Sequence, residues 1–253
     1  MGLFLLVARD NEDPEVVDRV RSTLNCDIAD QGMQYDGIIV LGGDGSVLRA
    51  VSCYDDPPII YAVNRGKVGF LCPIPYSKLD DLLEKLVCGI QIDMKRSIRL
   101  CFAGKRRFLN EAIIRSRVPR LSTFRICIDS MSFMIRGDAV IVSTRMGSSG
   151  YNASADGPLL LVDSIVINVV APNRCAFRPI VCGIESKISI EVDADPQVII
   201  DGMGYDEAGG CGSVFDIYYD GSVVRFGHLN EYDGSEKIEG LFMLNAGPVL
   251  SLE

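Results

Sequence analysis

The segment Gly37–Ser46 reads GIIVLGGDGS, an apolar run that leads into a glycine-rich turn with one aspartate. The aliphatic run predicts a buried strand, and the glycines allow the backbone after it to turn sharply or to approach a ligand closely. Asp44 stands in this turn with only small neighbours, which suits a proton acceptor or a metal ligand better than a core position. The segment therefore predicts a strand that ends in a turn able to meet a phosphate or a ribose.

The residues on either side of this segment alternate between apolar strands and amphipathic helices. A helix is expected to begin after Asp13, with Pro14 as its first residue, because aspartate caps helix N-termini and proline fits the first turn. A second helix is expected to begin at Ser46, and a third to be capped by Ser77. The strands are expected at Leu3–Ala8, Asp36–Leu41 and Ile59–Val63. Such alternation predicts βαβ units around a parallel sheet, with ligands at the carboxyl ends of the strands.

The pattern changes near Gln91, where short β-type runs separated by Gly, Pro, Asp and Asn begin. One helix is expected among them, at Tyr151–Leu160. The runs are Ile98–Phe102, Glu111–Arg115, Thr123–Ile128, Ala139–Ser143, Ser164–Val170, Lys187–Val192, Val198–Ile200 and Ser222–Phe226. They favour an antiparallel β domain. The predicted fold class is an α/β N-terminal Rossmann-like domain, residues 1–92, plus a mostly antiparallel all-β C-terminal domain, residues 93–230, with the tail at about 231–253 able to return to the first domain.

Composition narrows the class of protein. The 253 residues are 48% hydrophobic, enough to bury a core, and the net charge of −9 argues against a general nucleic-acid binder. Nine cysteines without a CxxC pair indicate reduced thiols in a cytoplasmic protein. No apolar run reaches the length of a membrane span, so no membrane partner is expected.

Four stretches could carry chemistry, and each also has an ordinary structural interpretation. The turn at Gly42–Ser46 could be a tight turn with a solvated carboxylate. Asn64–Leu71 offers glycines and bases at a strand end, which suits phosphates, but alone it is typical of a plain loop. Asn110-Glu111 could hydrogen-bond a base or ribose hydroxyls, although such pairs are mostly strand ends. Asp138–Tyr151 leads a buried strand into a small-residue loop whose N–H groups would cradle an anion, or would simply start a capped helix.

Taken together, in their order and spacing, the four stretches resemble the NAD kinase family over about residues 36–205. Gly42–Ser46 matches the family's glycine-aspartate motif, with serine for the usual threonine. Asn64–Leu71 matches its Asn-x-Gly-x-Leu-Gly-Phe-Leu stretch, and Asp138–Tyr151 its long small-residue segment. The family's Asn-Glu, Arg-Pro and later Asp-Gly elements correspond to Asn110-Glu111, Arg178-Pro179 and Asp201-Gly202.

The resemblance implies an enzyme that transfers a phosphoryl group from ATP to the 2′-hydroxyl of the adenosine ribose of NAD. It implies Asp44 as the catalytic base, Mg²⁺ bound with the phosphates of the donor, and no dedicated protein metal site. Such transfer needs positioning, charge neutralisation and a base. No Walker motif occurs, so ATP must be bound in another way. The substrate-binding residues implied are Gly43, Gly45, Phe70, Asn110, Glu111, Asp138, Gly147, Ser149, Gly150, Tyr151 and Ser154.

The chain departs from the family's pattern in the small-residue segment. Arg145 and Met146 stand where the family has Pro and Thr, and Ser149-Gly150 replaces Thr-Ala. Asp156 stands where Gly is usual. The small replacements should keep the loop open, whereas the bulkier Arg145 and Met146 are expected to alter the fine shape of the pocket.

Two other functions stay open, together with the question of assembly. A lipid or sugar kinase of the same glycine-aspartate superfamily would not need the Asn-Glu pair and the Asp138–Tyr151 segment. A non-catalytic sensor that binds NAD(P) would not need Asp44. In the family, the dinucleotide site commonly receives residues from a neighbouring subunit. A homodimer or homotetramer is therefore expected, with Asn173 and Arg174 near the shared site, since unprotected strand edges also invite pairing.

Overall fold

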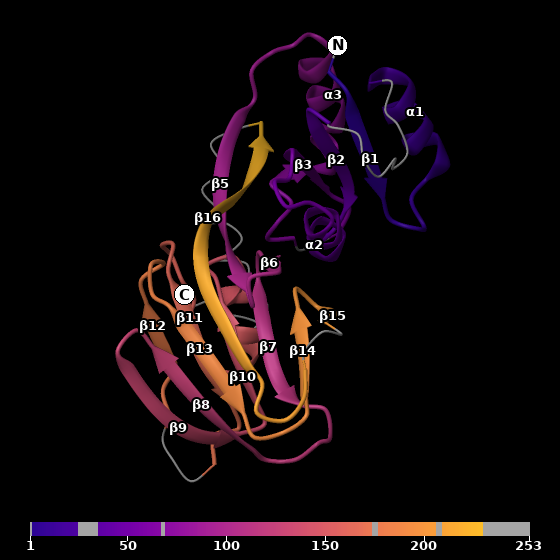
Figure 1. Cartoon of the computed structure of the whole chain (residues 1–253). Helices are drawn as coiled ribbons and strands as arrows, with labels where there is room; N and C mark the ends of the chain where they lie inside the picture. Colours follow the sequence, from indigo (N-terminus) through magenta and orange to yellow (C-terminus); the bar gives the residue numbers. More distant parts are fainter. Residues whose placement is uncertain (1, 25–34, 67–68, 174–176, 206–208, 230–253) are drawn as a thin grey trace, which may run out of the picture. The chain divides into compact units, whose positions relative to one another are not determined.

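The computed structural model describes residues 2–24, 35–66, 69–173, 177–205 and 209–229 (Figure 1). The described residues form two compact units, one made of those up to Arg96 together with residues 225–229, the other of those within Ser97–Val224. Two strands, β5 (Asp93–Phe102) and β16 (Val214–His228), run from one unit into the other. Each unit has its own hydrophobic core. The tail at 231–253 lies outside the described residues.

A parallel sheet forms the centre of the first unit. The register pairs Ala8 with Leu41 and Gly42 with Asn64, so the strands end at one edge. Near its end β16 adds to this sheet, with Phe226 opposite Ile60 in parallel. The other strands, in spatial order, are β1 (Phe4–Ala8), β2 (Gly37–Gly42) and β3 (Ile59–Asn64), with the short β4 (Ile74–Pro75) against the end of β3.

Three helices of the described residues accompany this sheet: α1 (Pro14–Leu24), α2 (Asp44–Ser52) and α3 (Leu79–Val87). The Asp13 side chain accepts the N–H of Glu15 at 3.0 Å, which confirms the expected cap and the place of Pro14. The expected cap at Ser77 is wrong, because this residue lies inside a 3₁₀ turn at Tyr76–Lys78. The N–H of Leu79 donates to the Tyr76 carbonyl there, so the turn itself satisfies the helix start.

The two faces of the sheet are covered by different helices. Ile39 and Leu41 of β2 share a core with buried residues of α1 and α3. Successive side chains of a strand point to opposite faces, so Ile38 and Val40, both fully buried, face the other way. On that face α2 packs against β2. Helices on both faces bury the strands completely and leave the carboxyl edge of the sheet as the place for ligands.

Two antiparallel ladders make up the second unit. One has the order β12-β11-β10-β7-β14-β15, and the other the order β16-β13-β8-β9, with β5 pairing with β16 and β6. Apolar side chains of both, such as Phe102, Phe124 and Val140, form one fully buried core. The strands are β6 (Arg106–Phe108), β7 (Glu111–Ser116), β8 (Ser122–Ile128), β9 (Met131–Gly137), β10 (Ala139–Ser143), β11 (Ile165–Val170), β12 (Ile180–Cys182), β13 (Ile188–Val192), β14 (Pro196–Ile200) and β15 (Met203–Tyr205).

The predicted fold class is right in outline and needs two corrections. The sheet that holds β1–β3 is mixed, because β16 pairs in parallel with β3 and antiparallel with β13. The second unit is not all-β, since it contains a 3₁₀ turn at Gly147–Ser149 and α4 (Tyr151–Ser154). The helix expected at Tyr151–Leu160 ends at Ser154. Its continuation is prevented by Asp156, which adopts a left-handed φ of 59°, and by Pro158.

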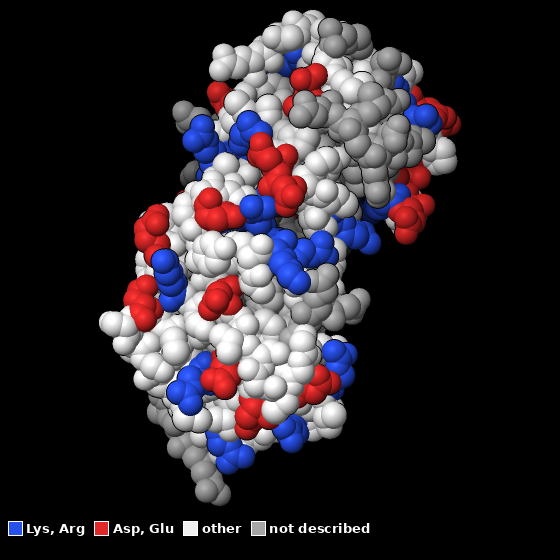
Figure 2. Space-filling view, viewed as in Figure 1, with Lys and Arg blue, Asp and Glu red and all other residues white. Residues whose placement is uncertain are grey.

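The surface mixes both signs of charge. On the face shown in Figure 2, Lys and Arg side chains alternate with Asp and Glu side chains, without an extended stripe of one sign. Among the described residues, no helix is long and apolar enough to cross a membrane.

Candidate active site

The glycine-aspartate segment forms the junction between β2 and α2. Gly43 is the N-cap of the helix with φ −122° and ψ −169°, so the junction does not use the left-handed backbone that its glycines would permit. Gly42 is required for another reason, because a Cβ there would lie 2.5 Å from the Ser46 Oγ. A Cβ at Gly43 or Gly45 would meet nothing within 4 Å. These two glycines therefore leave open space at the end of the strand, where a ligand can approach the backbone.

Asp44 is the first residue of α2, and its carboxylate is oriented by the loop after β3. Its Oδ2 accepts the N–H of Phe70 at 3.0 Å, and its Oδ1 accepts the N–H of Leu71 at 2.9 Å. A helix N-terminus also favours a negative charge at this position. Each carboxylate oxygen has a second lone pair, so the group is held in place and can still accept a proton. The structure thus brings together Asp44 and Phe70, two of the predicted site residues.

An ion-pair cluster anchors the loop after β3. Arg65 donates its backbone N–H to the Gly42 carbonyl at 2.9 Å, and its guanidinium contacts the two carboxylate oxygens of Glu12 at 2.9 and 2.6 Å. The same guanidinium lies 3.7 Å from the centre of the Tyr76 ring. Burial opposes the ionisation of Glu12, but the hydrogen bond and charge of Arg65 outweigh it and lower the pKa of this carboxyl. Arg65 therefore fixes the loop and is no free cation for a phosphate, and Lys67 lies outside the described residues.

In the second unit, Asn110 and Glu111 at the start of β7 lie against the loop after β10. A Cβ at Gly147 would lie 2.2 Å from the Asn110 carbonyl oxygen, so only glycine fits there. Thr144 donates its N–H to that same oxygen at 2.9 Å. A Cβ at Gly150 would lie 3.3 Å from the Oε2 of Glu111. The structure thus gathers four predicted residues, Asn110, Glu111, Gly147 and Gly150.

Two oxygens of this cluster are buried without a hydrogen-bond partner among the described residues. They are the Oδ1 of Asn110 and the Oε2 of Glu111. Burial, and after it the charge of Asp201, raise the pKa of Glu111 to about 7. A buried acceptor without a donor is costly, and such exceptions call for an explanation. Two adjacent acceptors of this kind match a ligand that carries N–H or O–H donors.

The remaining predicted residues divide into neighbours of this cluster and one distant residue. Tyr151, 41% exposed, and the half-buried Ser149 belong to the same loop and its helix. The Ser154 hydroxyl donates to the Gly150 carbonyl at 3.4 Å within that helix. Asp138 precedes β10 at its other end, on the order of 15 Å along the strand from the cluster. There it lines an opening of about 440 Å³ together with Arg115, Arg117, Arg120 and Gln197.

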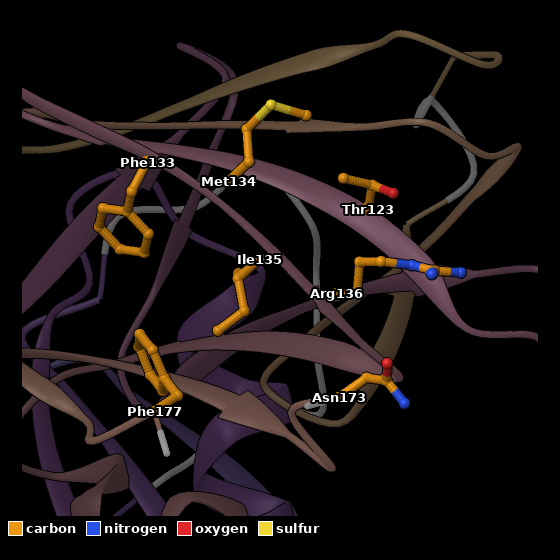
Figure 3. Close-up of a pocket in the computed structure, with 7 residues that line it drawn as sticks. All are labelled: Thr123, Phe133, Met134, Ile135, Arg136, Asn173 and Phe177. Carbon is orange, nitrogen blue, oxygen red and sulfur yellow. The ribbon is translucent and has the colours of Figure 1, made fainter. Parts of the chain in front are cut away.

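A second depression, of about 510 Å³, lies over β8 and β9 (Figure 3). In this view Phe133 and Ile135 lie on the side of Phe177, and the two rings have centroids 6.2 Å apart. Asn173 lies at the other end beside Arg136, whose carbonyl accepts the Asn173 N–H at 2.8 Å. None of the residues that line this depression belongs to the Asn110-Glu111 cluster, so the two are separate.

The comparisons with known proteins agree with this geometry. Residues 7–90 match the model of the ATP-NAD kinase N-terminal domain, and residues 109–209 match that of the ATP-NAD kinase C-terminal domain.

The chain belongs to the ATP-NAD kinase family.

Curated relatives agree with this family, and a solved structure agrees with its fold. It is 33% identical to the NAD kinase of Methanopyrus kandleri, over 79% of this chain and 76% of the relative. It is 30% identical to the NAD kinase of Clostridium perfringens, over 80% of this chain and 78% of the relative. Its fold is similar to the crystal structure of an NAD kinase from Archaeoglobus fulgidus in complex with ATP, with a TM-score of 0.80, 23% identity and coverage of 97% and 100% of the two chains. The chain is therefore an enzyme of this family, which leaves neither the lipid or sugar kinase nor the sensor as its function.

The departures from the family segment leave the backbone of the loop intact. The Arg145 carbonyl accepts the Ser148 hydroxyl at 2.8 Å, which holds the turn where the family has proline. The Arg145 side chain is engaged elsewhere, with its Nε 3.2 Å from the Oδ1 of Asp163 and its Nη2 3.9 Å from the Met146 sulfur. The two bulky replacements therefore contact each other and the segment before β11.

A buried amide pair holds the helix that carries Tyr151. Asn168 donates to the Asn152 Oδ1 at 3.3 Å and to the Ala155 carbonyl at 2.9 Å. Asn152 in turn donates to the Pro158 carbonyl at 3.0 Å. A Cβ at Gly157 would lie 2.0 Å from the Asn152 Oδ1, so glycine is required there. This pair fixes the chain that follows the predicted nucleotide loop.

Sequence reasoning named Asp201 as a motif match but did not count it as a site residue. The structure places its buried side chain directly beneath Asn110 and Glu111. The match of Asp201-Gly202 to the family's Asp-Gly element was the one signal in the sequence that pointed to it. Among the described residues, no group of three or more His, Cys, Asp and Glu side chains could hold a metal ion.

Proposed function

We propose that this enzyme transfers the terminal phosphoryl group of ATP to the 2′-hydroxyl of the adenosine ribose of NAD. The ribose oxygen bonds to phosphorus, the bond between that phosphorus and ADP breaks, and the hydroxyl loses its proton. The products are NADP, ADP and one proton. The relatives support this reaction because they are NAD kinases, and the similar NAD kinase from Archaeoglobus fulgidus forms a complex with ATP.

The observation that carries the proposal is the pair of unpartnered oxygens on Asn110 and Glu111. The adenosine end of NAD offers an amino group and ribose hydroxyls, which are the donors that these acceptors lack. Gly150 keeps side-chain atoms away from the Oε2 of Glu111, from which a Cβ there would lie 3.3 Å, and Gly147 allows its loop to pack closely on the Asn110 backbone. Phe70, Ser149 and Tyr151 supply the further surface that the family resemblance assigns to the dinucleotide.

Asp44 is the proposed general base. Its carboxylate is fixed by two backbone N–H groups and is bordered by the open space at Gly43 and Gly45. A carboxylate at this place serves no packing role. It would take the proton from the 2′-hydroxyl as that oxygen attacks phosphorus.

Mg²⁺ is proposed to enter with the donor. The residues fit such an ion, because the carboxylate of Asp44 offers hard oxygen ligands. Each of its oxygens accepts one backbone N–H and keeps a second lone pair for the ion. Mg²⁺ commonly keeps several waters and the phosphates of its nucleotide as ligands, so one carboxylate is sufficient. When bound, the ion neutralises charge on the transferred phosphoryl group. Asp44 would hold it directly or through one of its waters.

The test is the formation of NADP. Purified protein is given Mg²⁺, NAD and ATP, and the product is read by coupling to an NADP-specific dehydrogenase. Asp44→Asn should lower turnover by roughly 10²–10⁴, the usual worth of a positioned base, while NAD binding by calorimetry stays nearly unchanged. Asp10→Asn, an exposed acid in the same unit, is the matched control. Turnover of Asp44→Asn near that of the wild type would refute the assignment of the base.

A homodimer or homotetramer is proposed for the assembly, with Asn173 near a site shared between subunits. Met134 lies on β9, the last strand of its ladder, and is 65% exposed, so it offers an apolar surface to a second copy. Asp138, distant from the Asn110-Glu111 cluster of its own chain, would then serve the dinucleotide of a second copy. Arg174 lies outside the described residues. Sedimentation equilibrium at assay concentration tests this, and a fully active monomer would overturn both the assembly and the shared site.

A further inference from the structure

A single buried side chain accepts the backbone N–H groups beneath the Asn110-Glu111 pair. The Oδ2 of Asp201 accepts the N–H of Leu109 at 2.8 Å. Its Oδ1 accepts the N–H groups of Asn110 at 2.8 Å and of Glu111 at 3.2 Å. Asp201 is 6% exposed, and its own N–H donates to the Glu111 carbonyl at 2.9 Å. The segment is thus held through its backbone, while the Oδ1 of Asn110 and the Oε2 of Glu111 have no partner among the described residues.

The identity of this residue is not explained by the turn in which it lies. Asp201 and Gly202 form the two-residue loop between β14 and β15, with φ values of 49° and 77°. This is the geometry of a type I′ turn, in which asparagine before glycine is at least as favourable as aspartate. The three N–H donors, however, point at both terminal atoms of the side chain, so both atoms must accept hydrogen bonds. The two oxygens of aspartate can do so, whereas the NH₂ group of asparagine cannot accept. The carboxylate is therefore selected by Leu109–Glu111 and not by the turn.

A buried arginine makes this carboxylate tolerable. Arg99 is 1% exposed, and its Nε donates to the Ser222 hydroxyl at 3.1 Å. Burial raises the pKa of Asp201 to about 6, although its backbone donors and then the charge of Arg99 lower it. Asp201 is thus ionised at neutral pH and can accept from all three donors.

We propose that Asp201 is a positioning residue for the dinucleotide, which acts by fixing the backbone of Leu109–Glu111 so that the free oxygens of Asn110 and Glu111 face the ligand. The proposal rests on the substrate roles assigned to that pair above. It requires no contact between Asp201 and the substrate.

Asp201→Asn is the decisive variant. Asparagine keeps the turn but replaces one acceptor with a donor, so one buried N–H loses its partner. The KM for NAD should rise about tenfold, the effect of one lost buried hydrogen bond, while kcat and the KM for ATP stay within about twofold. Exchange of the backbone hydrogens of residues 109–111, followed by mass spectrometry, should become faster.

Asp129→Asn is the matched control. Asp129 also lies in a two-residue hairpin turn at positive φ, 51°, and its Oδ1 also accepts a backbone N–H, that of Lys187 at 2.9 Å. It is exposed and belongs to the β8–β9 turn. This variant should leave the KM for NAD and exchange at residues 109–111 unchanged.

The outcomes separate the proposal from its alternatives. An unchanged KM for NAD in Asp201→Asn, or an equal rise in Asp129→Asn, overturns it. A fall in kcat of a hundredfold or more at constant KM overturns it in favour of a catalytic role. If Asp201→Asn does not fold, exchange in the wild type still decides, because amides of residues 109–111 that exchange as fast as exposed Gly183 would contradict the arrangement. A wild type that forms no NADP at all would instead refute the proposed function.

Discussion

Glu111→Gln should change how the stability of this protein depends on pH. The wild-type carboxyl is buried near Asp201, and both effects raise its pKa from 4.5 to about 7. Between these two values the unfolded chain releases the proton while the folded chain keeps it. The free energy of unfolding of the wild type therefore falls as pH rises from about 4.5 to 7, and the loss is complete above pH 7. Glutamine has the same shape and no proton to lose, so the variant lacks this loss.

The size of the effect follows from the shift. A difference of about 2.5 pKa units at about 1.4 kcal/mol each gives an upper value of about 3.5 kcal/mol. The stability of Glu111→Gln minus that of the wild type should therefore increase by about 2–3 kcal/mol from pH 4.5 to pH 8. The sign is unusual for a carboxyl group, because most carboxyl groups have a lowered pKa in the folded protein, so their contribution to the free energy of unfolding is lost as pH falls.

Urea unfolding at pH 4.5, 5.5, 6.5, 7.5 and 8 measures the difference between variant and wild type. The exposed Glu185 gives the control, Glu185→Gln, whose difference from the wild type should not change across this range. A flat difference for Glu111→Gln would show that water reaches the carboxyl freely. The reasoning about the unpartnered Oε2 would then fail as well.

Three further predictions test other parts of the site. Gly150→Val places methyl groups against the Glu111 Oε2, which would lie only 3.3 Å from a Cβ at residue 150, and should raise the KM for NAD roughly tenfold with little change in Tm. An unchanged KM would show that this loop does not touch the substrate. Gly157→Ala puts a Cβ 2.0 Å from the Asn152 Oδ1 and should lower the free energy of unfolding in urea by about 1–3 kcal/mol; a loss below about 0.5 kcal/mol would mean that the amide pair moves freely. Glu12→Gln should destabilise the protein more at pH 7 than at pH 3, because the lowered pKa of Glu12 gives stability above 4.5 that is lost as pH falls through the folded value. Equal destabilisation at both pH values in thermal melts would contradict the role of the Arg65 ion pair.

The predictable parts of this protein are those in which local residues determine local structure. Asp13-Pro14 started a helix where capping and proline geometry require one. The run before Gly42 is a fully buried parallel strand, because only a strand covered on both faces needs so continuous an apolar sequence. Because the apolar run stops at Gly42, the place of Asp44 just after the end of that strand could be predicted too. The order of the motifs then identified the family.

The parts that escaped prediction depend on contacts between distant residues. In β9 the exposed Met131 and Met134 are three positions apart and so point to opposite faces, and the pairing of this strand with β8 cannot be read from a pattern that lacks clean alternation. Gly42 is needed because a Cβ there would clash with the side chain of Ser46, and not because its backbone has a positive φ. This clash can be seen only once the start of α2 is known. The role of Asp201 could not be predicted, although its motif was matched, because the N–H groups that it accepts lie about ninety positions earlier in the chain.

The ion pair between Arg145 and Asp163 has a consequence for ionic strength. The family's pattern has a proline at the position of Arg145, and the covalent ring of a proline stiffens a loop in a way that salt cannot weaken. In this chain the loop is joined to Asp163 by charges that are partly exposed, 22% and 43%, and dissolved ions screen such charges over about 8 Å at physiological salt. An exposed pair contributes at most about 1 kcal/mol, so added salt should loosen the loop only modestly. We therefore expect added salt to act on this loop through the Arg145–Asp163 pair, an effect that a proline at the same place would not show.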